Sequence, residues 1–127
     1  FQCEQIYSGR EMENHHGGVI LVGDHVYGMD QRSMKCIDLR TGQVAWQNRA
    51  VGKGSIAYAD GHFVIRAEGG NGTMALVEAS PRGYVEKGRF DQPDRSDRNS
   101  WPHPVLFGGR MYIRDQDLLL CYNLRAK

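Results

Sequence analysis

Histidine and tryptophan side chains that precede two apolar stretches are the residues of this chain best suited to bind a ligand or a metal ion. His15 and His16 precede one stretch, and Trp101 and His103 precede another. If the fold brings the two segments together, His16, Trp101 and His103 could face a common ligand. No Cys or carboxylate lies at metal-ligand spacing from the histidines, so we predict no metal site and expect solvated loop side chains.

Two charged segments could carry calcium or acid–base chemistry. Residues 91–100 contain acidic spacing similar to the start of an EF-hand loop, but they lack its central Gly and its closing Glu. Residues 114–117 hold Asp115 and Asp117 in a tight turn, with no visible partner for acid–base catalysis. We therefore expect a solvated insertion at 91–100, with a partner or ligand contact as the alternative, and turn-forming carboxylates at 114–117. No catalytic residue is predicted.

The stretch 36–46 predicts a β-hairpin. Hairpins of this kind could position the segments that carry these side chains. Its first half alternates polar and apolar side chains like a half-buried strand, and a second short strand follows the turn. Gly42 stands where a hairpin turn needs a positive φ, and Asp38 can accept hydrogen bonds from turn amides. Thr41 and Trp46 complete this structural motif, and the large indole must pack against a neighbouring element.

The hairpin belongs to a unit of four short strands that recurs along the chain. Turns at Asp24, Gly61 and Gly109 mark three copies at intervals of roughly 40 to 50 residues, which is the spacing of propeller blades. The sequence therefore predicts an all-β fold, a β-propeller made of four-stranded antiparallel blades. Within one segment spanning 1–127, the predicted units are an outer strand of a preceding or closing blade at 1–10, blades at 17–49 and 54–90, and three strands of a blade at 102–127.

These units add up to about three blades, whereas closed propellers typically have 4 to 8. We therefore expect either a fragment of a longer propeller or a chain that completes its ring with another copy. In the second case a homodimer would close a ring of about six blades, because closed symmetry is the usual outcome of self-association.

The motif that begins at Cys36 and ends at Trp46 reads small-x-Asp-x-x-Thr-Gly-x-x-x-Trp. It resembles the tryptophan-docking repeat of the PQQ-like (quinoprotein-type) β-propellers, with Cys36 in a slot usually held by Ala. The resemblance covers nearly all of the chain from residue 17 onward, although only the first blade carries the full motif. In this family the docking Trp holds neighbouring blades together, which implies that role for Trp46.

The resemblance implies two kinds of function. Quinoprotein dehydrogenases of this superfamily hold PQQ over the propeller axis with a Trp floor, a calcium ion, an acidic base and often a vicinal disulfide. None of these constellations maps onto this chain, which has no adjacent Cys pair. Other members are periplasmic scaffolds, such as the outer-membrane-assembly lipoprotein, which bind proteins without a cofactor. We therefore expect a non-catalytic binding or scaffold module, periplasmic or secreted, with no cofactor.

Two alternatives stay open at this stage. The chain could be part of a PQQ-dependent alcohol or sugar dehydrogenase whose catalytic residues lie outside it, with PQQ and calcium as cofactors. A sugar- or metal-binding propeller that uses His16 and His103 is a third class.

Composition excludes two classes of partner. The chain has 16 Lys and Arg against 15 Asp and Glu, well mixed, for a formal net charge of +1, which gives no basic surface for nucleic acid or anionic membrane. Nothing approaches the ~18 consecutive apolar residues of a membrane span. The expected partner is a protein or a second copy. The three cysteines are an odd number, and we expect Cys36 and Cys121 to be buried strand residues.

Overall fold

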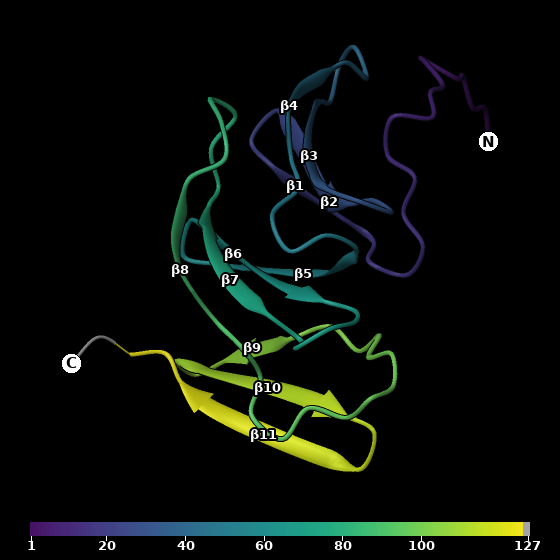
Figure 1. Cartoon of the computed structure of the whole chain (residues 1–127). Helices are drawn as coiled ribbons and strands as arrows, with labels where there is room; N and C mark the ends of the chain where they lie inside the picture. Colours follow the sequence, from purple (N-terminus) through teal and green to yellow (C-terminus); the bar gives the residue numbers. More distant parts are fainter. Residues whose placement is uncertain (126–127) are drawn as a thin grey trace.

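The computed structural model describes residues 1–125, which form three antiparallel β-sheets and no helix (Figure 1). The first sheet has the order β1(Val19–Val22), β2(His25–Met29), β3(Met34–Asp38), β4(Val44–Asn48). The second has the order β5(Gly54–Ala59), β6(His62–Ala67), β7(Met74–Glu78), β8(Glu86–Phe90). The third has the order β11(Leu118–Asn123), β10(Arg110–Asp115), β9(Val105–Phe107).

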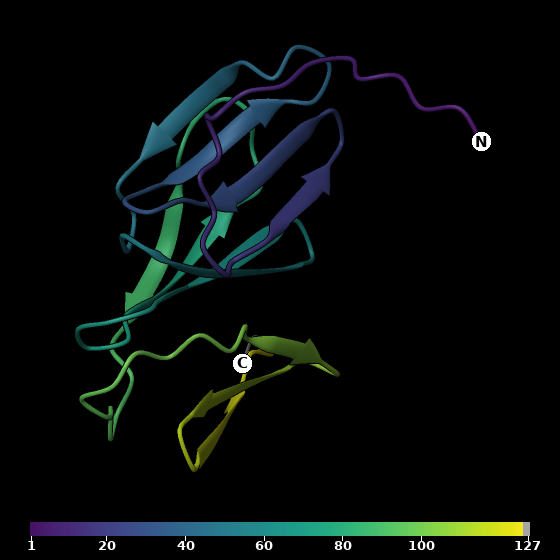
Figure 2. The same ribbon diagram turned by 90° about the vertical axis from the view of Figure 1, so that its right-hand side faces the viewer.

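The predicted fold class, all-β with four-stranded antiparallel blades, is confirmed by this arrangement. The sheets follow one another along the chain and pack as successive layers, with the second sheet between the other two (Figures 1 and 2). The last residues of the unit predicted at 102–127 lie outside the described residues. Within residues 1–125 there is no helix of the length and hydrophobicity that a membrane crossing requires.

The first hairpin of each sheet closes with a tight turn at a glycine. Gly61 and Gly109 have φ of 72°, and each follows a residue that also has positive φ, Asp60 and Gly108 respectively. Two successive positive φ values are typical of the type I′ turn, whose twist matches the twist of the flanking strands. In the first sheet the positive φ of 59° falls on Gly23. These local choices explain why the strand–turn–strand pattern was visible in the sequence.

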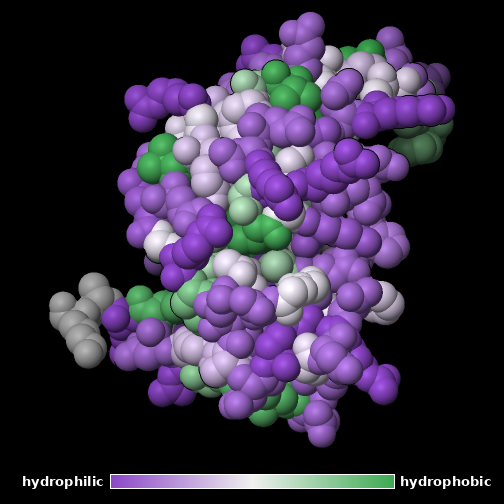
Figure 3. Space-filling view, in the orientation of Figure 1, coloured by the Kyte–Doolittle hydropathy of each residue, from purple (hydrophilic) through white to green (hydrophobic). Residues whose placement is uncertain are grey.

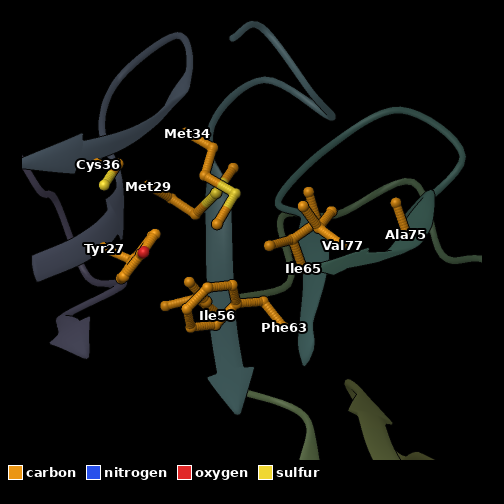
Figure 4. Close-up of a cluster of buried hydrophobic side chains, with 9 residues drawn as sticks. All are labelled: Tyr27, Met29, Met34, Cys36, Ile56, Phe63, Ile65, Ala75 and Val77. Atoms are coloured by element: carbon orange, nitrogen blue, oxygen red, sulfur yellow. The ribbon is translucent and has the colours of Figure 1, made fainter. Parts of the chain in front are cut away.

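The larger apolar core lies between the first and second sheets (Figure 4). Its buried members are Tyr27, Met29, Met34 and Cys36 from the first sheet and Ile56, Phe63, Ile65, Ala75 and Val77 from the second. The rings of Tyr27 and Phe63 lie 4.7 Å apart at their centroids. Close packing of these side chains stabilises the contact between the two sheets.

A second apolar core lies between the second and third sheets. Val64 and Met74 of the second sheet pack against Met111 and Ile113 of the third, with Leu106 and Tyr122 partly buried beside them. Because neighbouring residues of a strand point to opposite faces, β6 supplies side chains to both cores. The second sheet is therefore apolar on both faces.

Trp46 contacts both the first sheet and the second. Its indole N–H donates a hydrogen bond to the backbone oxygen of Ser80 at 2.8 Å. Its ring lies 6.1 Å from the ring of Tyr27 and 6.2 Å from that of Tyr84, measured between centroids. Ser80 and Tyr84 belong to the connection between β7 and β8, so the indole spans the junction of the two sheets.

The turn between β3 and β4 is held by the carboxylate of Asp38. Oδ1 accepts hydrogen bonds from the backbone N–H of Arg40 at 2.9 Å, and from the N–H and hydroxyl of Thr41 at 2.9 and 3.0 Å. The backbone N–H of Thr41 contributes most to holding the pKa of Asp38 below its ordinary value. Gly42 completes the turn with a φ of 73°, a conformation that costs other residues about 1 kcal/mol or more.

Residues 7–14, here called the N-terminal strap, lie across the outer face of the first sheet (Figure 2). The Tyr7 hydroxyl donates to the backbone oxygen of Leu39 at 2.8 Å, and Lys35 Nζ donates to the backbone oxygen of Glu11 at 2.6 Å. The strap covers this face over β2 and β3. On β1, Val19 and Leu21 stay 53% and 57% exposed.

The prediction of an outer strand at residues 1–10 is wrong for this structure. The first strand of the described residues begins at Val19, and residues 1–10 are exposed and irregular. A strand needs a neighbouring backbone with free donors and acceptors. The segment instead meets a sheet face through side chains such as Tyr7, so it gains contacts without joining a ladder.

The two strand cysteines differ in environment. Cys36 is buried in the larger core, as expected, but Cys121 is exposed, so the prediction of its burial is wrong. Cys121 points from β11 to the face of the third sheet that no other sheet covers. Both thiols are free.

Replacing Gly42 with Ala tests the contact between the strap and the first sheet. An added Cβ would lie 2.9 Å from the Tyr7 ring, so this variant has both backbone strain and a clash. Gly23→Ala is the matched control, because its φ of 59° gives strain but nothing lies within 4 Å. We expect Gly23→Ala to lower the free energy of unfolding by about 1 kcal/mol and Gly42→Ala to lower it further, measured by urea denaturation. Equal losses would contradict the strap contact.

Candidate functional site

Glu68 lies at the centre of a polar cluster that joins the three sheets. It directly follows β6 and is 8% exposed. One carboxylate oxygen accepts a hydrogen bond from the Trp101 indole N–H at 2.9 Å. The other lies 3.1 Å from His16 Nε2 and 3.0 Å from Lys53 Nζ. The carboxylate thus connects the segments that precede β1, β5 and β9.

The charge of Glu68 is stabilised by its partners. Burial by itself would raise the pKa of Glu68, because a carboxylate loses hydration inside a protein. Hydrogen bonds from Trp101, His16 and Lys53, together with the Lys53 charge, outweigh burial and lower the pKa to about 2. Glu68 is therefore ionised at neutral pH, and its low basicity makes it a poor general base.

His103 is a structural bridge in the same cluster. Its Nδ1 lies 3.1 Å from the backbone oxygen of Ile56, and its Nε2 lies 2.9 Å from the backbone oxygen of His16. Carbonyl oxygens can only accept, so both contacts are hydrogen bonds when both ring nitrogens carry a proton. Below, the Glu68 cluster means His16, Lys53, Glu68, Trp101 and His103.

A second polar network lies under the loop formed by residues 91–100. Arg66 is fully buried and donates to Gln92 Oε1 at 2.5 Å, and Gln92 Nε2 donates to Asp115 Oδ2 at 2.9 Å. Arg66 belongs to the second sheet and Asp115 to the third. The loop is therefore not the solvated insertion that its composition indicated, because Gln92 ties it between two sheets.

Asp115 is a buried ion-pair partner rather than a simple turn former. It is 2% exposed. It accepts hydrogen bonds from the Ser96 N–H at 2.9 Å, the Ser96 hydroxyl at 2.7 Å and Arg95 Nη1 at 2.8 Å. Burial opposes ionisation, but these donors hold the pKa of Asp115 well below its usual range. The expectation that this carboxylate only shapes a turn is wrong.

The structure brings the three candidate binding residues together, although they come from segments far apart in the sequence. His16, Trp101 and His103 all belong to the Glu68 cluster, and the His16 and Trp101 rings lie 6.1 Å apart at their centroids. Sequence analysis missed the carboxylate that organises them. A signal for Glu68 existed, because an acidic residue ends or follows the second strand of every sheet, at Asp30, Glu68 and Asp115.

The Glu68 cluster does not fit PQQ with calcium. The Trp101 N–H donates to Glu68, and both His103 ring nitrogens face backbone oxygens of the protein. The ionised Glu68 would repel an anionic quinone, and Lys53 pairs with Glu68. Calcium requires several oxygen ligands, and Glu68 is the one cluster member with carboxylate oxygens.

An apolar groove of about 400 Å³ opens between the second and third sheets. Its apolar lining includes Val64, Met74, Leu76 and Phe90 of the second sheet and Leu106 and Met111 of the third. Asp60 and His62 also line the groove, and His62 Nδ1 lies 2.8 Å from the backbone oxygen of Asp60 rather than from its carboxylate.

Comparisons with known proteins support the fold. No model of a known protein family matches the sequence, and no curated protein matches it. The chain is similar to the crystal structure of BamB from Moraxella catarrhalis, with 15% identity and a TM-score of 0.63, over 84% of this chain and 32% of BamB. It thus spans about a third of the length of BamB. At this identity, the similarity supports a β-propeller-like fold and no more.

A second similar structure is the computationally designed Ika4 protein. The identity is 10% and the TM-score is 0.47, over 98% of this chain and 100% of Ika4. This similarity is too low to support a conclusion.

The pKa of Glu68 predicts a loss of stability in acid. Because the folded pKa of about 2 lies below the ordinary value of 4.5, the stabilisation is present above the ordinary value and is lost as pH falls toward 2. Its size is on the order of 3 kcal/mol. Glu68→Gln should therefore unfold more easily at pH 7 and lose less stability between pH 5 and pH 3 than the wild type, measured by urea denaturation in metal-free buffer. An exposed control, Glu13→Gln, should follow the wild type, and identical pH slopes for all three proteins would contradict the prediction.

Proposed function

We propose that the chain is a non-catalytic, protein-binding scaffold module of the PQQ-like propeller type that docks its partner through the outer face of the third sheet. The observation that carries the proposal is the exposure of large apolar side chains on that face, where Phe107 is 78% and Leu119 is 68% exposed. Below, this surface is called the bare face. It consists of Val105, Phe107, Arg110, Tyr112, Arg114, Leu119, Cys121 and Asn123.

The strand register places these side chains on one side of the sheet. Val105 and Cys121 both lie opposite Tyr112, and Leu119 lies opposite Arg114. Directly opposed residues of antiparallel strands point to the same face. Figure 3 shows hydrophobic side chains at the lower surface of the molecule, in the region where Figure 1 places β11.

The other faces of the same molecule show what such a surface can do. On β10, Met111 and Ile113 point away from the bare face and are buried against the second sheet. The bare face presents side chains of similar size with nothing over them among the described residues. Each Å² of apolar surface removed from water contributes roughly 25 cal/mol of stabilisation. Packing a second apolar sheet against the bare face would therefore be favourable.

The occupant that fits best is a β-sheet of a partner protein with acidic groups at its rim. A sheet matches the flat geometry, because the sheets inside this molecule already pack face to face. Arg110 and Arg114 lie among the apolar side chains of the bare face and are exposed, so carboxylates of the partner would complement them.

Two observations argue against a catalytic role for the clusters described above. The polar side chains of the Glu68 cluster bond mainly to one another and to backbone, and the low pKa of Glu68 removes it from proton transfer at neutral pH. A periplasmic or secreted location rests on the family resemblance and stays a prediction.

Self-association of the purified chain tests the bare face, because an uncovered apolar sheet face associates with itself when its partner is absent. We expect the mass measured by light scattering to rise with protein concentration. The double variant Phe107→Asp, Leu119→Asp should weaken this association by about tenfold or more. The control Val19→Asp, Leu21→Asp changes two residues of similar chemistry on the first sheet, 53% and 57% exposed, and should leave association unchanged.

Two results would overturn the proposal. A wild-type chain that stays monomeric at all concentrations would show that the bare face does not dock apolar surfaces. Equal weakening by the two double variants would show that the association does not depend on the bare face.

A further inference from the structure

His15, His16 and Glu68 form a group suited to a metal ion, where the segment before the first sheet meets the second sheet. One potential ligand atom of each residue lies within 4.8 Å of those of the other two. Neighbouring residues of an extended chain point in opposite directions, but the backbone bends at both histidines. Their rings therefore approach each other, with centroids 5.3 Å apart.

His16 presents a possible coordinating atom directly to Glu68. This atom is Nε2, which lies 3.1 Å from Glu68 Oε2 and donates its proton to the ionised carboxylate in the ion-free protein. An ion bound to both atoms at the ordinary distances of roughly 2.0–2.2 Å would fit between them and replace that hydrogen bond. The ring proton would then reside on Nδ1, which has no hydrogen-bond partner among residues 1–125.

Lys53 occupies the position next to Glu68 where a cation would be most stable. Its ammonium group lies 3.0 Å from the same carboxylate oxygen that His16 approaches, and its side chain is 28% exposed. A flexible side chain at the surface can swing into solvent at small cost. Trp101 holds the other oxygen of Glu68 and would keep the carboxylate in place during the exchange.

We propose that His15, His16 and Glu68 bind a divalent transition-metal ion in competition with Lys53. Two imidazole nitrogens and one carboxylate oxygen suit Zn²⁺, Cu²⁺ or Ni²⁺, whereas Mg²⁺ and Ca²⁺ prefer oxygen ligands alone. A water molecule completes a tetrahedral set. The ion links the segment before β1 to the end of β6, so it strengthens the junction between the first two sheets.

Titration calorimetry with Zn²⁺ as the probe tests this proposal. Because the free thiols of Cys3 and Cys121 are exposed and thiolates also bind zinc, every protein carries Cys3→Ser and Cys121→Ser. We expect one Zn²⁺ per chain, with binding kept in excess Mg²⁺. His15→Ala should weaken binding by about tenfold or more, and circular dichroism checks its folding. His25→Ala, a histidine of β2 outside the group, is the matched control and should bind as the background protein does.

Lys53→Met provides the most specific test, because removing the competing cation should tighten Zn²⁺ binding. The proposal is overturned if the background protein does not bind Zn²⁺, or if His15→Ala binds as well as His25→Ala does. A Lys53→Met variant that binds no more tightly would show that the ion does not use Glu68.

Discussion

The need to cover both faces of an apolar sheet determines how this molecule is built. In the second sheet, Phe63 and Val64 are neighbours on β6 and lie in different cores, so the sheet is stable only between two others. Each outer sheet has one face covered in this way and one face that needs something else. The N-terminal strap covers part of the first, and the bare face of the third has no cover among the described residues. Trp46 is packed because its face of the first sheet meets the second sheet, and Phe107 is exposed because no sheet covers its face of the third among the described residues.

Polar contacts fix the relative position of sheets that apolar packing alone would hold only loosely. Asp30, Glu68 and Asp115 occupy the same place in each sheet, at the end of the second strand, and all three are buried with pKa values below the ordinary range. In each case burial opposes the charge and hydrogen bonds outweigh it. Moving one sheet against the next would leave the charge of Glu68 or Asp115 without partners, which is costly. The partners of Asp30 all belong to the first sheet. We therefore infer that Glu68 and Asp115 specify how the sheets align, whereas Asp30 holds the turn between β2 and β3.

Local chemistry explains how much could be predicted from the sequence. The alternation around Cys36, the glycine turns and the repeat interval are properties of short segments, and they predicted the sheets well. Glu68 was missed because its partners His16 and Trp101 are distant along the chain, although the repeated acidic position could have revealed it. The outer strand predicted at 1–10 failed for the opposite reason. An alternating pattern does not show whether a neighbouring strand exists, and here side chains such as Tyr7 bind a sheet face.

The strap also has a consequence for assembly. An open filament grows only if each copy offers two surfaces that fit each other. Among residues 1–125 the strap lies over β2 and β3 of the first sheet, which leaves mainly β1 of that face exposed. Copies that met through their bare faces around a two-fold axis would therefore form a closed pair, with a smaller apolar surface left for further growth.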